Sequence, residues 1–300
     1  MGGEGDIKQW FLSNGFGDVA KKGGSFGGSG WSSTSRWQSA EKSFFVKTSS
    51  KKCESMFLGE AAGLRAMKKA ADSMGGDEDR LVVPEVFAAR DYDDGKGSFI
   101  IMEFLNLGGR GDAKVFGRAL ARMHLAEGPS EFGFEVDNTC GATPQPNDWS
   151  KDWPQFYTEQ RLKHQVNLAG DAAISRVAEL LYPRVPEFFD GVEVKPSIIH
   201  GDLWSGNIGT AEGHPSIFDP ACYYAHHEAE WGMSWCASLG PKFWEGYREL
   251  LPQSPGFNMR RPLYEAYHQL NHYNLFGGGY RNAAINCMEQ ALKALDESQK

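Results

Sequence analysis

The chain has 300 residues, of which 41% are hydrophobic and 23% charged, with a formal net charge of −8. This composition is that of a globular protein, and the length favours one large domain or two joined lobes. The acidic balance argues against a broad nucleic-acid-binding face, and no apolar run approaches the roughly 18 residues of a membrane-spanning helix. The five cysteines are odd in number and form no Cys-x-x-Cys pair, which favours reduced thiols.

The N-terminal part predicts a short helix at residues 8–13 and then a glycine-rich segment at 23–30. The segment is not a Walker A loop, because no Gly-Lys-Ser/Thr closes it, and it is an incomplete dinucleotide fingerprint. Its glycines could bring backbone N–H groups close to phosphates, as in the kinase glycine-rich loop. A flexible linker is the alternative. The candidate phosphate-binding residues are Gly28, Ser29 and Gly30.

The aromatic and branched residues 43–47 predict a strand that ends at Lys47. Glu60 follows within residues 57–67, which have helical character. A lysine that binds phosphates must be held in place, and a glutamate on a helix is its usual partner in kinases. A surface lysine and a surface glutamate are the alternative, but Glu60 has small and apolar neighbours, which favours the pair.

Residues 81–84 and 86–89 predict a strand pair around an edge proline, and residues 98–104 predict a buried strand. The buried strand runs into a glycine-rich break at 108–111. Two kinase lobes would hinge at such a break, and an adenine would face the backbone there; a plain strand and turn is the alternative. The candidate adenine-binding residues are Met102, Glu103, Phe104 and Leu105.

The second half predicts helices around one polar loop. Residues 133–153 read as a long irregular segment, and Asp171 is placed to cap a helix. The expected helices cover residues 114–125, 153–168, 172–181, 242–251, 261–274 and 281–296.

The polar loop follows the apolar residues 198–199 and carries the strongest chemical signal. Asn207 stands five positions after Asp202, the spacing of the kinase catalytic loop, in which the Asp orients a hydroxyl and the Asn holds a metal ion. Asp219 follows its own apolar pair, at the position of the metal-binding Asp. Asp and Asn also favour turns by bonding to nearby backbone. The strand context and the upstream Lys47 favour the catalytic interpretation.

Histidines, acids and aromatic residues are mixed in the stretch 220–231. Two histidines beside Glu228 and Glu230 invite a zinc interpretation, but the His-Glu-x-x-His spacing is absent.

Together these segments resemble the fructosamine kinases (ketosamine 3-kinases), relatives of the aminoglycoside and choline kinases. The resemblance covers nearly the whole chain, and Trp204 in the His-Gly-Asp loop makes it far more specific than the loop alone. The stretches that carry it are SFFVK (43–47), IMEF (101–104), GFEVDN (133–138), HGDLWSGN (200–207), DPA (219–221) and YNLF (273–276).

The resemblance implies an α+β, bilobal, protein-kinase-like fold, with an N-lobe antiparallel sheet and one main helix in residues 1–105 and a mostly helical C-lobe in 106–300. It implies ATP and Mg²⁺ as cofactors. The implied reaction is phosphorylation of the 3-hydroxyl of a ketosamine, free or on a protein, which leads to deglycation. We expect a cytoplasmic monomer or homodimer without nucleic-acid or membrane partners. An organellar form stays open, because a transit peptide could precede the sequence.

Carried over residue by residue, Lys47 would bind phosphates, Glu60 would hold Lys47, and Asp202 would orient or deprotonate the hydroxyl. Asn207 and Asp219 would bind Mg²⁺. The candidate substrate contacts are Trp204, which could stack on the sugar or merely pack, Glu228 and Glu230 for the amine, and His272, for which a core position is equally open.

Two departures and two rivals accompany this interpretation. Gly201 and Pro220-Ala221 replace protein-kinase residues, and no Ala-Pro-Glu segment follows, so an activation loop and a peptide platform are not expected. Several family members carry a glycine-loop cysteine that crosslinks two chains; Gly30 stands there, which argues against that redox switch.

The rivals are a kinase for another small hydroxylated amine, of the aminoglycoside or choline type, and a non-catalytic nucleotide-binding protein.

Overall fold

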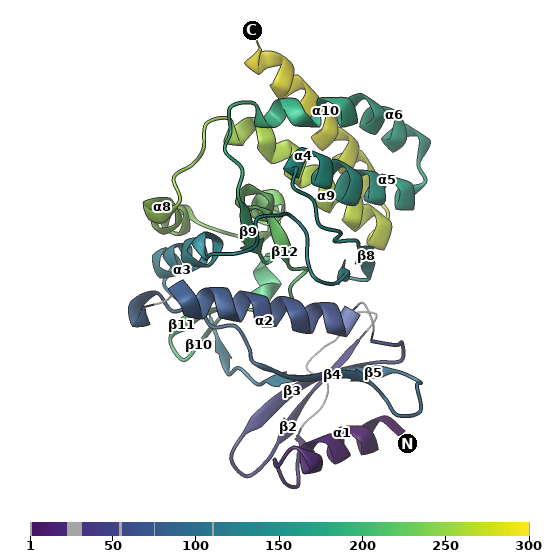
Figure 1. The fold of residues 1–300 in the computed structure, drawn as a ribbon, viewed down its shortest axis with the longest axis vertical. Helices are drawn as coiled ribbons and strands as arrows, with labels where there is room; N and C mark the ends of the chain where they lie inside the picture. Colours follow the sequence, from purple (N-terminus) through teal and green to yellow (C-terminus); the bar gives the residue numbers. More distant parts are fainter. Residues whose placement is uncertain (1, 23–31, 54–55, 75, 110, 300) are drawn as a thin grey trace.

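The computed structural model describes residues 2–22, 32–53, 56–74, 76–109 and 111–299. Figure 1 shows two lobes, with a sheet and α1 in the smaller lobe and most helices in the larger one. The expected α+β, bilobal architecture is therefore confirmed. The glycine-rich candidates Gly28, Ser29 and Gly30 lie outside the described residues.

An antiparallel sheet with the strand order β1-β2-β3-β5-β4 forms the smaller lobe. The helix α1 (Gly2–Ser13) lies on one face of this sheet, and α2 (Met56–Met74) lies between the sheet and the larger lobe (Figure 1). The strands are β1 (Ala20–Lys22), β2 (Ser33–Gln38), β3 (Ser43–Ser49), β4 (Val86–Asp91) and β5 (Ser98–Glu103).

Alternation along β3 separates the two faces of the sheet. Successive side chains of a strand point to opposite faces. Phe44 and Val46 are buried in a cluster with Phe11 of α1, and the Phe11 and Phe44 ring centroids are 4.7 Å apart. Lys47 therefore faces the other side, toward α2 and the larger lobe. The helix α1 begins at Gly2, before the expected residue 8, and its Ile7 is buried in the same cluster.

The larger lobe is mostly helical, and the buried positions of α2 share its hydrophobic core. The expected helix at 153–168 is found as α4 and α5 joined by a π-helical segment at Tyr157–Lys163. Asp171 caps α6 by accepting hydrogen bonds from the backbone of Ala173 and Ile174, as predicted. The helices are α3 (Ala113–Leu125), α4 (Trp153–Phe156), α5 (His164–Ala169), α6 (Ala172–Leu181), α7 (Ser234–Ala237), α8 (Pro241–Leu250), α9 (Phe257–Phe276) and α10 (Tyr280–Ser298).

Short strand pairs frame the polar loop of the larger lobe. Antiparallel pairing joins β9 to β12, β10 to β11 and β7 to β8, and β6 adds to β10. Their bounds are β6 (Leu107–Gly108), β7 (Asn138–Cys140), β8 (Thr143–Gln145), β9 (Pro196–Ile199), β10 (Ile208–Ala211), β11 (His214–Ile217) and β12 (Tyr223–His226).

The predicted strand pair around Pro84 is wrong. Residues 81–84 form no strand, and β4 pairs with β5 instead. Val82 makes a single parallel bridge to Ser216 of β11, which ties this segment to the larger lobe. Its branched residues are buried by packing rather than by strand pairing, and the proline at 84 offers no N–H to a ladder.

Two further expectations concern membrane-spanning helices and the cysteines. None of the described helices combines the length and the apolar character that crossing a bilayer requires. The five cysteines carry free thiols. The division at residues 105 and 106 stays a prediction; β6 begins at Leu107 and already pairs with the larger lobe.

Candidate active site

The polar loop between β9 and β10 is held by hydrogen bonds from several directions. His200 Nδ1 accepts from the Asp202 backbone N–H (3.2 Å), so the neutral ring carries its proton on Nε2, which donates to the Phe218 carbonyl (2.9 Å). Burial lowers the pKa of His200, which favours this neutral form. The loop is thereby fixed to the segment that precedes Asp219.

Gly201 is required by its backbone. Its φ is +77°, and a Cβ there would lie 2.2 Å from the Ala221 carbonyl oxygen. Only glycine adopts this conformation without a side-chain clash. The residue that replaces the arginine of protein kinases thus lets the loop approach the Pro220-Ala221 segment closely.

Asn207 joins the two predicted acids. Its Nδ2 donates to the backbone carbonyls of Asp202 (2.9 Å) and Asp219 (3.3 Å). Asp219 has a φ of +62°, a region that Asp tolerates better than most residues. The three residues predicted to form the catalytic and metal centre are therefore brought together.

Lys47 reaches the same centre from β3. Its Nζ lies 2.7 Å from Glu60 Oε1 on α2 and 2.6 Å from Asp219 Oδ1. The predicted Lys47–Glu60 pair is confirmed, whereas the ion pair with Asp219 was not foreseen. Burial disfavours the charged lysine, but the two carboxylates outweigh it and raise the pKa of Lys47.

The carboxylates of the centre differ in their electrostatics. Burial raises the pKa of Asp202 to about 7, and the charges of Asp219 and Glu230 add to the rise. Burial also raises the pKa of Glu60 to about 7, against the attraction of Lys47. For Asp219, burial works in the same direction, but Lys47 prevails and lowers the pKa below its usual value. Asp202 is thus poised to hold or release a proton near neutral pH.

Two cavities open on this centre, and Lys47, Glu60 and Asp219 line both. The first, of about 570 Å³, is also lined by Asp202 and by residues of α7, α9 and α10. The second, of about 670 Å³, lies toward the sheet and is also lined by all four predicted adenine contacts, Met102, Glu103, Phe104 and Leu105. Two reactants in these cavities would meet at Asn207 and Asp219, with Asp202 on the side of the first cavity.

Trp204 stands where the cavities meet. It lines both of them, and its side chain is 43% exposed. Its six-membered ring packs against Gly206, where a Cβ would lie 2.2 Å from the ring. The indole is thus held in place while part of it faces the cleft.

Glu228 and Glu230 do not reach either cavity, which corrects the expectation that they meet an amine. Glu228 is 1% exposed and accepts two hydrogen bonds from the buried Arg260, at 2.7 and 2.8 Å. Glu230, also 1% exposed, accepts from the backbone N–H groups of His200 (2.7 Å) and Gly201 (3.0 Å). Glu228 therefore neutralises the buried Arg260, and Glu230 supports the backbone of the catalytic loop.

His272 lines the first cavity, as expected, and its Nδ1 hydrogen bonds to the His268 carbonyl (2.7 Å). Sequence reasoning missed Trp235, Phe276 and Tyr280, which line the same cavity. Their signal was weak, because they come from three separate helices. Phe276 ends the YNLF stretch that carries the resemblance, but no chemical role was attached to it.

The donor set fits a magnesium ion. The Asn207 amide nitrogen faces two carbonyls, so its oxygen points to the opposite side of the amide, and Asp219 engages Lys47 through only one carboxylate oxygen. Amide and carboxylate oxygens are the ligands that Mg²⁺ prefers in nucleotide sites. The Asp219 side chain is 56% exposed, so a ligand can reach it.

Comparison with known proteins decides the family. The fructosamine kinase family model matches residues 11–294. The chain belongs to the fructosamine kinase family. It is 45% identical over 300 residues to the chloroplastic protein-ribulosamine 3-kinase of Oryza sativa subsp. indica, covering 98% of this chain and 85% of that protein.

Solved structures agree on the fold. A Haemophilus somnus protein assigned as a fructosamine-3-kinase superposes with a TM-score of 0.83 at 24% identity, covering 97% of this chain and 98% of that one. An aminoglycoside phosphotransferase crystallised with ADP and hygromycin B gives a TM-score of 0.59 at 14% identity, covering 97% and 98%. These likenesses establish the protein-kinase-like fold of the family member described here.

Proposed function

We propose that this protein transfers the γ-phosphoryl group of ATP to the 3-hydroxyl of a ketosamine, the adduct of a sugar with a lysine amine, and so initiates protein deglycation. The observation that carries the proposal is the pair of cavities that share Lys47, Asn207 and Asp219, with Asp202 lining the first of them. ATP would occupy the cavity on the side of the sheet, and the ketosamine would occupy the cavity lined by Asp202.

Asp202 is the proposed catalytic base. The acceptor hydroxyl gives its proton to the Asp202 carboxylate as its oxygen bonds to the γ-phosphorus, and the bond from that phosphorus to the bridging oxygen of ADP breaks. A base with a pKa near the working pH is the most effective, and Asp202 meets this condition with a pKa raised to about 7. Glu230 acts indirectly, by holding the backbone of the loop.

The nucleotide would be held from both sides of its cavity. Lys47 would bind phosphate oxygens while Glu60 keeps its ammonium group in place. The backbone of residues 102–105 would face the adenine. The resemblance assigns Gly28, Ser29 and Gly30 to the phosphates.

Asn207 and Asp219 would hold Mg²⁺, which supplies charge neutralisation on the transferring phosphoryl group when bound. Lys47 already contacts Asp219, so a phosphate held by the lysine and a metal ion held by the carboxylate would lie next to each other. Trp204 would lay its exposed indole face on the carbon-bound hydrogens of the sugar.

The first acceptor to test is ribulose-lysine, because the rice relative is named a protein-ribulosamine 3-kinase. ADP release with Mg·ATP should be measured for ribulose-, fructose- and erythrulose-lysine, an aminoglycoside and choline. We expect turnover with the ketosamines and none with the other two. Turnover confined to the aminoglycoside or choline would overturn the assignment, and failure to bind Mg·ATP in a thermal-shift titration would favour a non-catalytic protein.

For the assembly and the compartment, we propose a monomer or homodimer in the cytoplasm. Light scattering after size exclusion tests the first point. The rice relative is named chloroplastic, so an organelle is the alternative location, and imaging of a fluorescent fusion of the full-length protein distinguishes the two.

A further inference from the structure

Aromatic side chains from three helices line part of the first cavity, in which the acceptor would bind. Trp235 comes from α7, His272 and Phe276 from α9, and Tyr280 from α10. We call these four residues the aromatic rim. The ring centroid of His272 lies 5.4 Å from that of Trp235, 5.7 Å from that of Phe276 and 5.0 Å from that of Tyr280.

Two rings of the aromatic rim are largely exposed. Trp235 is 44% exposed and Phe276 is 59% exposed, although both line a cavity. Trp235 is nevertheless oriented, because its Nε1 donates to the Gly232 carbonyl (3.1 Å). Exposed aromatic rings that gather at the mouth of a pocket are typical of a binding surface.

The charged groups that line the first cavity belong to the catalytic centre and not to the aromatic rim. Among its described lining residues, the carboxylates are Glu60, Asp202 and Asp219, and the lysine is Lys47. The rim carries no carboxylate, and burial lowers the pKa of His272, so its ring is neutral at pH 7. Glu228 and Glu230, which were expected to meet a cation, are buried elsewhere.

We propose that the aromatic rim receives the N-alkyl ammonium stem of the acceptor, through cation–π contact and burial of the alkyl chain. The inference rests on the proposed function. A ketosamine whose sugar lies at Asp202 and Trp204 carries an amine and an aliphatic chain that must continue outward along the same cavity. Ring faces attract such cations in the absence of a carboxylate. The rim thus selects sugar adducts of alkylamines over unsubstituted aminosugars.

The test compares two cationic acceptors, an N-butyl ketosamine and the corresponding 1-amino-1-deoxyketose without the butyl group. The variants are Trp235→Leu and Phe276→Leu, with Trp235→Phe as the conservative change. Trp149→Leu is the matched control, because Trp149 is 43% exposed and lies outside the residues that line the cavity.

We expect the two leucine variants to raise KM for the N-butyl acceptor about three- to tenfold, with kcat within about twofold. KM for the unsubstituted acceptor, which keeps the ammonium group but lacks the alkyl chain, should rise clearly less than KM for the N-butyl acceptor. Trp235→Phe should restore most of the loss, and the control should match the wild type.

Equal KM changes for both acceptors, or none, would overturn the inference while leaving the proposed function intact. Loss of a dimer in Trp235→Leu without a change in KM would assign the rim to self-association and also overturn it. If the wild type phosphorylates neither acceptor, nor any ketosamine of the earlier panel, the proposed function itself fails.

Discussion

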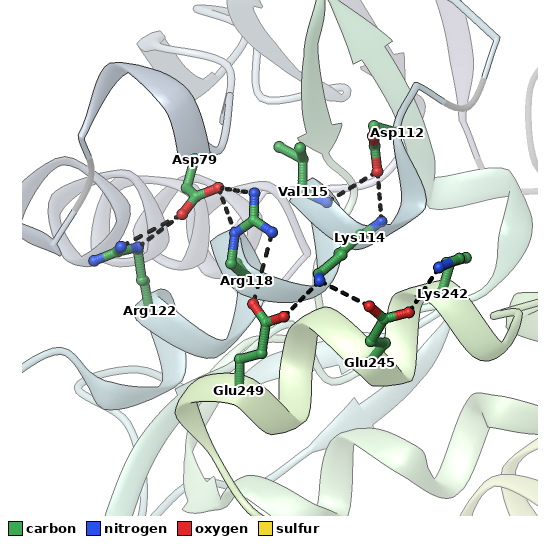
Figure 2. Close-up of polar contacts among 9 residues, drawn as sticks. All are labelled: Asp79, Asp112, Lys114, Val115, Arg118, Arg122, Lys242, Glu245 and Glu249. Carbon is green, nitrogen blue, oxygen red and sulfur yellow. Dashed lines mark hydrogen bonds and ion pairs between the residues drawn. The ribbon is translucent and has the colours of Figure 1, made fainter.

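Two ion-pair networks connect segments that are distant in sequence, and they differ mainly in exposure. The catalytic network joins Lys47, Glu60 and Asp219. The side chains of Lys47 and Glu60 are only 10% and 7% exposed, whereas that of Asp219 is 56% exposed where it faces the cavities. The surface network, shown in Figure 2, joins the turn after α2 to α3 and α8. Its members are Asp79, Lys114, Arg118, Arg122, Lys242, Glu245 and Glu249.

The surface network lies beside a contact that backbone packing already determines. A Cβ on Gly117 would lie 2.1 Å from the Phe243 carbonyl oxygen, and one on Gly246 would lie 2.1 Å from that of Lys114. The backbones of α3 and α8 therefore meet through glycines, and the ion pairs flank this contact. Exposed ion pairs of this kind contribute little each.

The catalytic network has the opposite character. Burying charges costs more than their attraction returns in most proteins, so a buried lysine between two carboxylates is poor evidence of a stabilising device. The role of the catalytic network is positional, because the network holds an ammonium group where a phosphate would bind and a carboxylate where a metal ion would bind. The comparison predicts that changes in the catalytic network affect turnover and that changes in the surface network affect only stability.

The largest effect is expected for Asp219→Asn. The change removes the charge that would bind Mg²⁺ and one partner of Lys47, while asparagine tolerates the positive φ. We expect kcat/KM to fall at least about 10³-fold. Thermal unfolding should stay within a few degrees of the wild type, and loss of the folded state instead would contradict a positional role.

Glu60→Gln is expected to be milder. Lys47 keeps Asp219 but loses the contact that fixes it to α2. We expect kcat/KM to fall about 10- to 100-fold, with a higher KM for ATP. Glu85→Gln, which alters an exposed pair with Lys42 in the same lobe, is the control. Equal kinetics for the two variants would remove Glu60 from its role.

Asp79→Asn addresses the most buried member of the surface network. Its side chain is 9% exposed and contacts Arg118 and Arg122, which are 25% and 35% exposed. We expect the free energy of unfolding to fall by about 1–2 kcal/mol in urea denaturation, with kcat within about twofold. Glu245→Gln, at 45% exposure, should lower the free energy of unfolding clearly less than Asp79→Asn does. A tenfold loss of kcat in Asp79→Asn would contradict the prediction that changes in the surface network affect only stability.

Two buried histidines extend the comparison to pH. Burial lowers the pKa of His227 and of His268 from 6.5 to about 3. The unfolded chain therefore binds protons that the folded one does not, so their contribution to stability is complete above about pH 6.5 and declines as the pH falls toward 3. At pH 5.5 each should cost about 1 kcal/mol. In His227→Gln, the urea midpoint should fall less between pH 7.5 and 5.5 than it does in the wild type. An equal fall in both proteins would contradict a contribution of His227 to the pH dependence of stability.

Local pattern was sufficient for much of the fold and for the centre of the site. The aromatic and branched residues 43–47 predicted the strand that carries Lys47, although β3 continues to Ser49. The Asp202–Asn207 spacing belongs to a single loop whose conformation depends on adjacent residues. Asp171 was recognisable as a cap because capping is also local.

What could not be predicted depends on contacts between distant segments. Glu228 meets Arg260 on α9, and Glu230 meets the backbone of His200, so both acids that looked available are occupied. The aromatic rim assembles only when three helices pack. Residues 81–84 resembled a strand because their branched side chains are buried, yet their burial comes from packing.

The most direct test of the central claim is detection of the phosphorylated product. Wild-type protein and Asp202→Asn should be incubated with Mg·ATP and ribulose-lysine, and the products followed by ³¹P NMR and mass spectrometry. The account predicts one ketosamine 3-phosphate per ADP for the wild type and a rate at least about 10²-fold lower for the variant. Product formation at equal rates, or ADP release without a phosphorylated ketosamine, would contradict it.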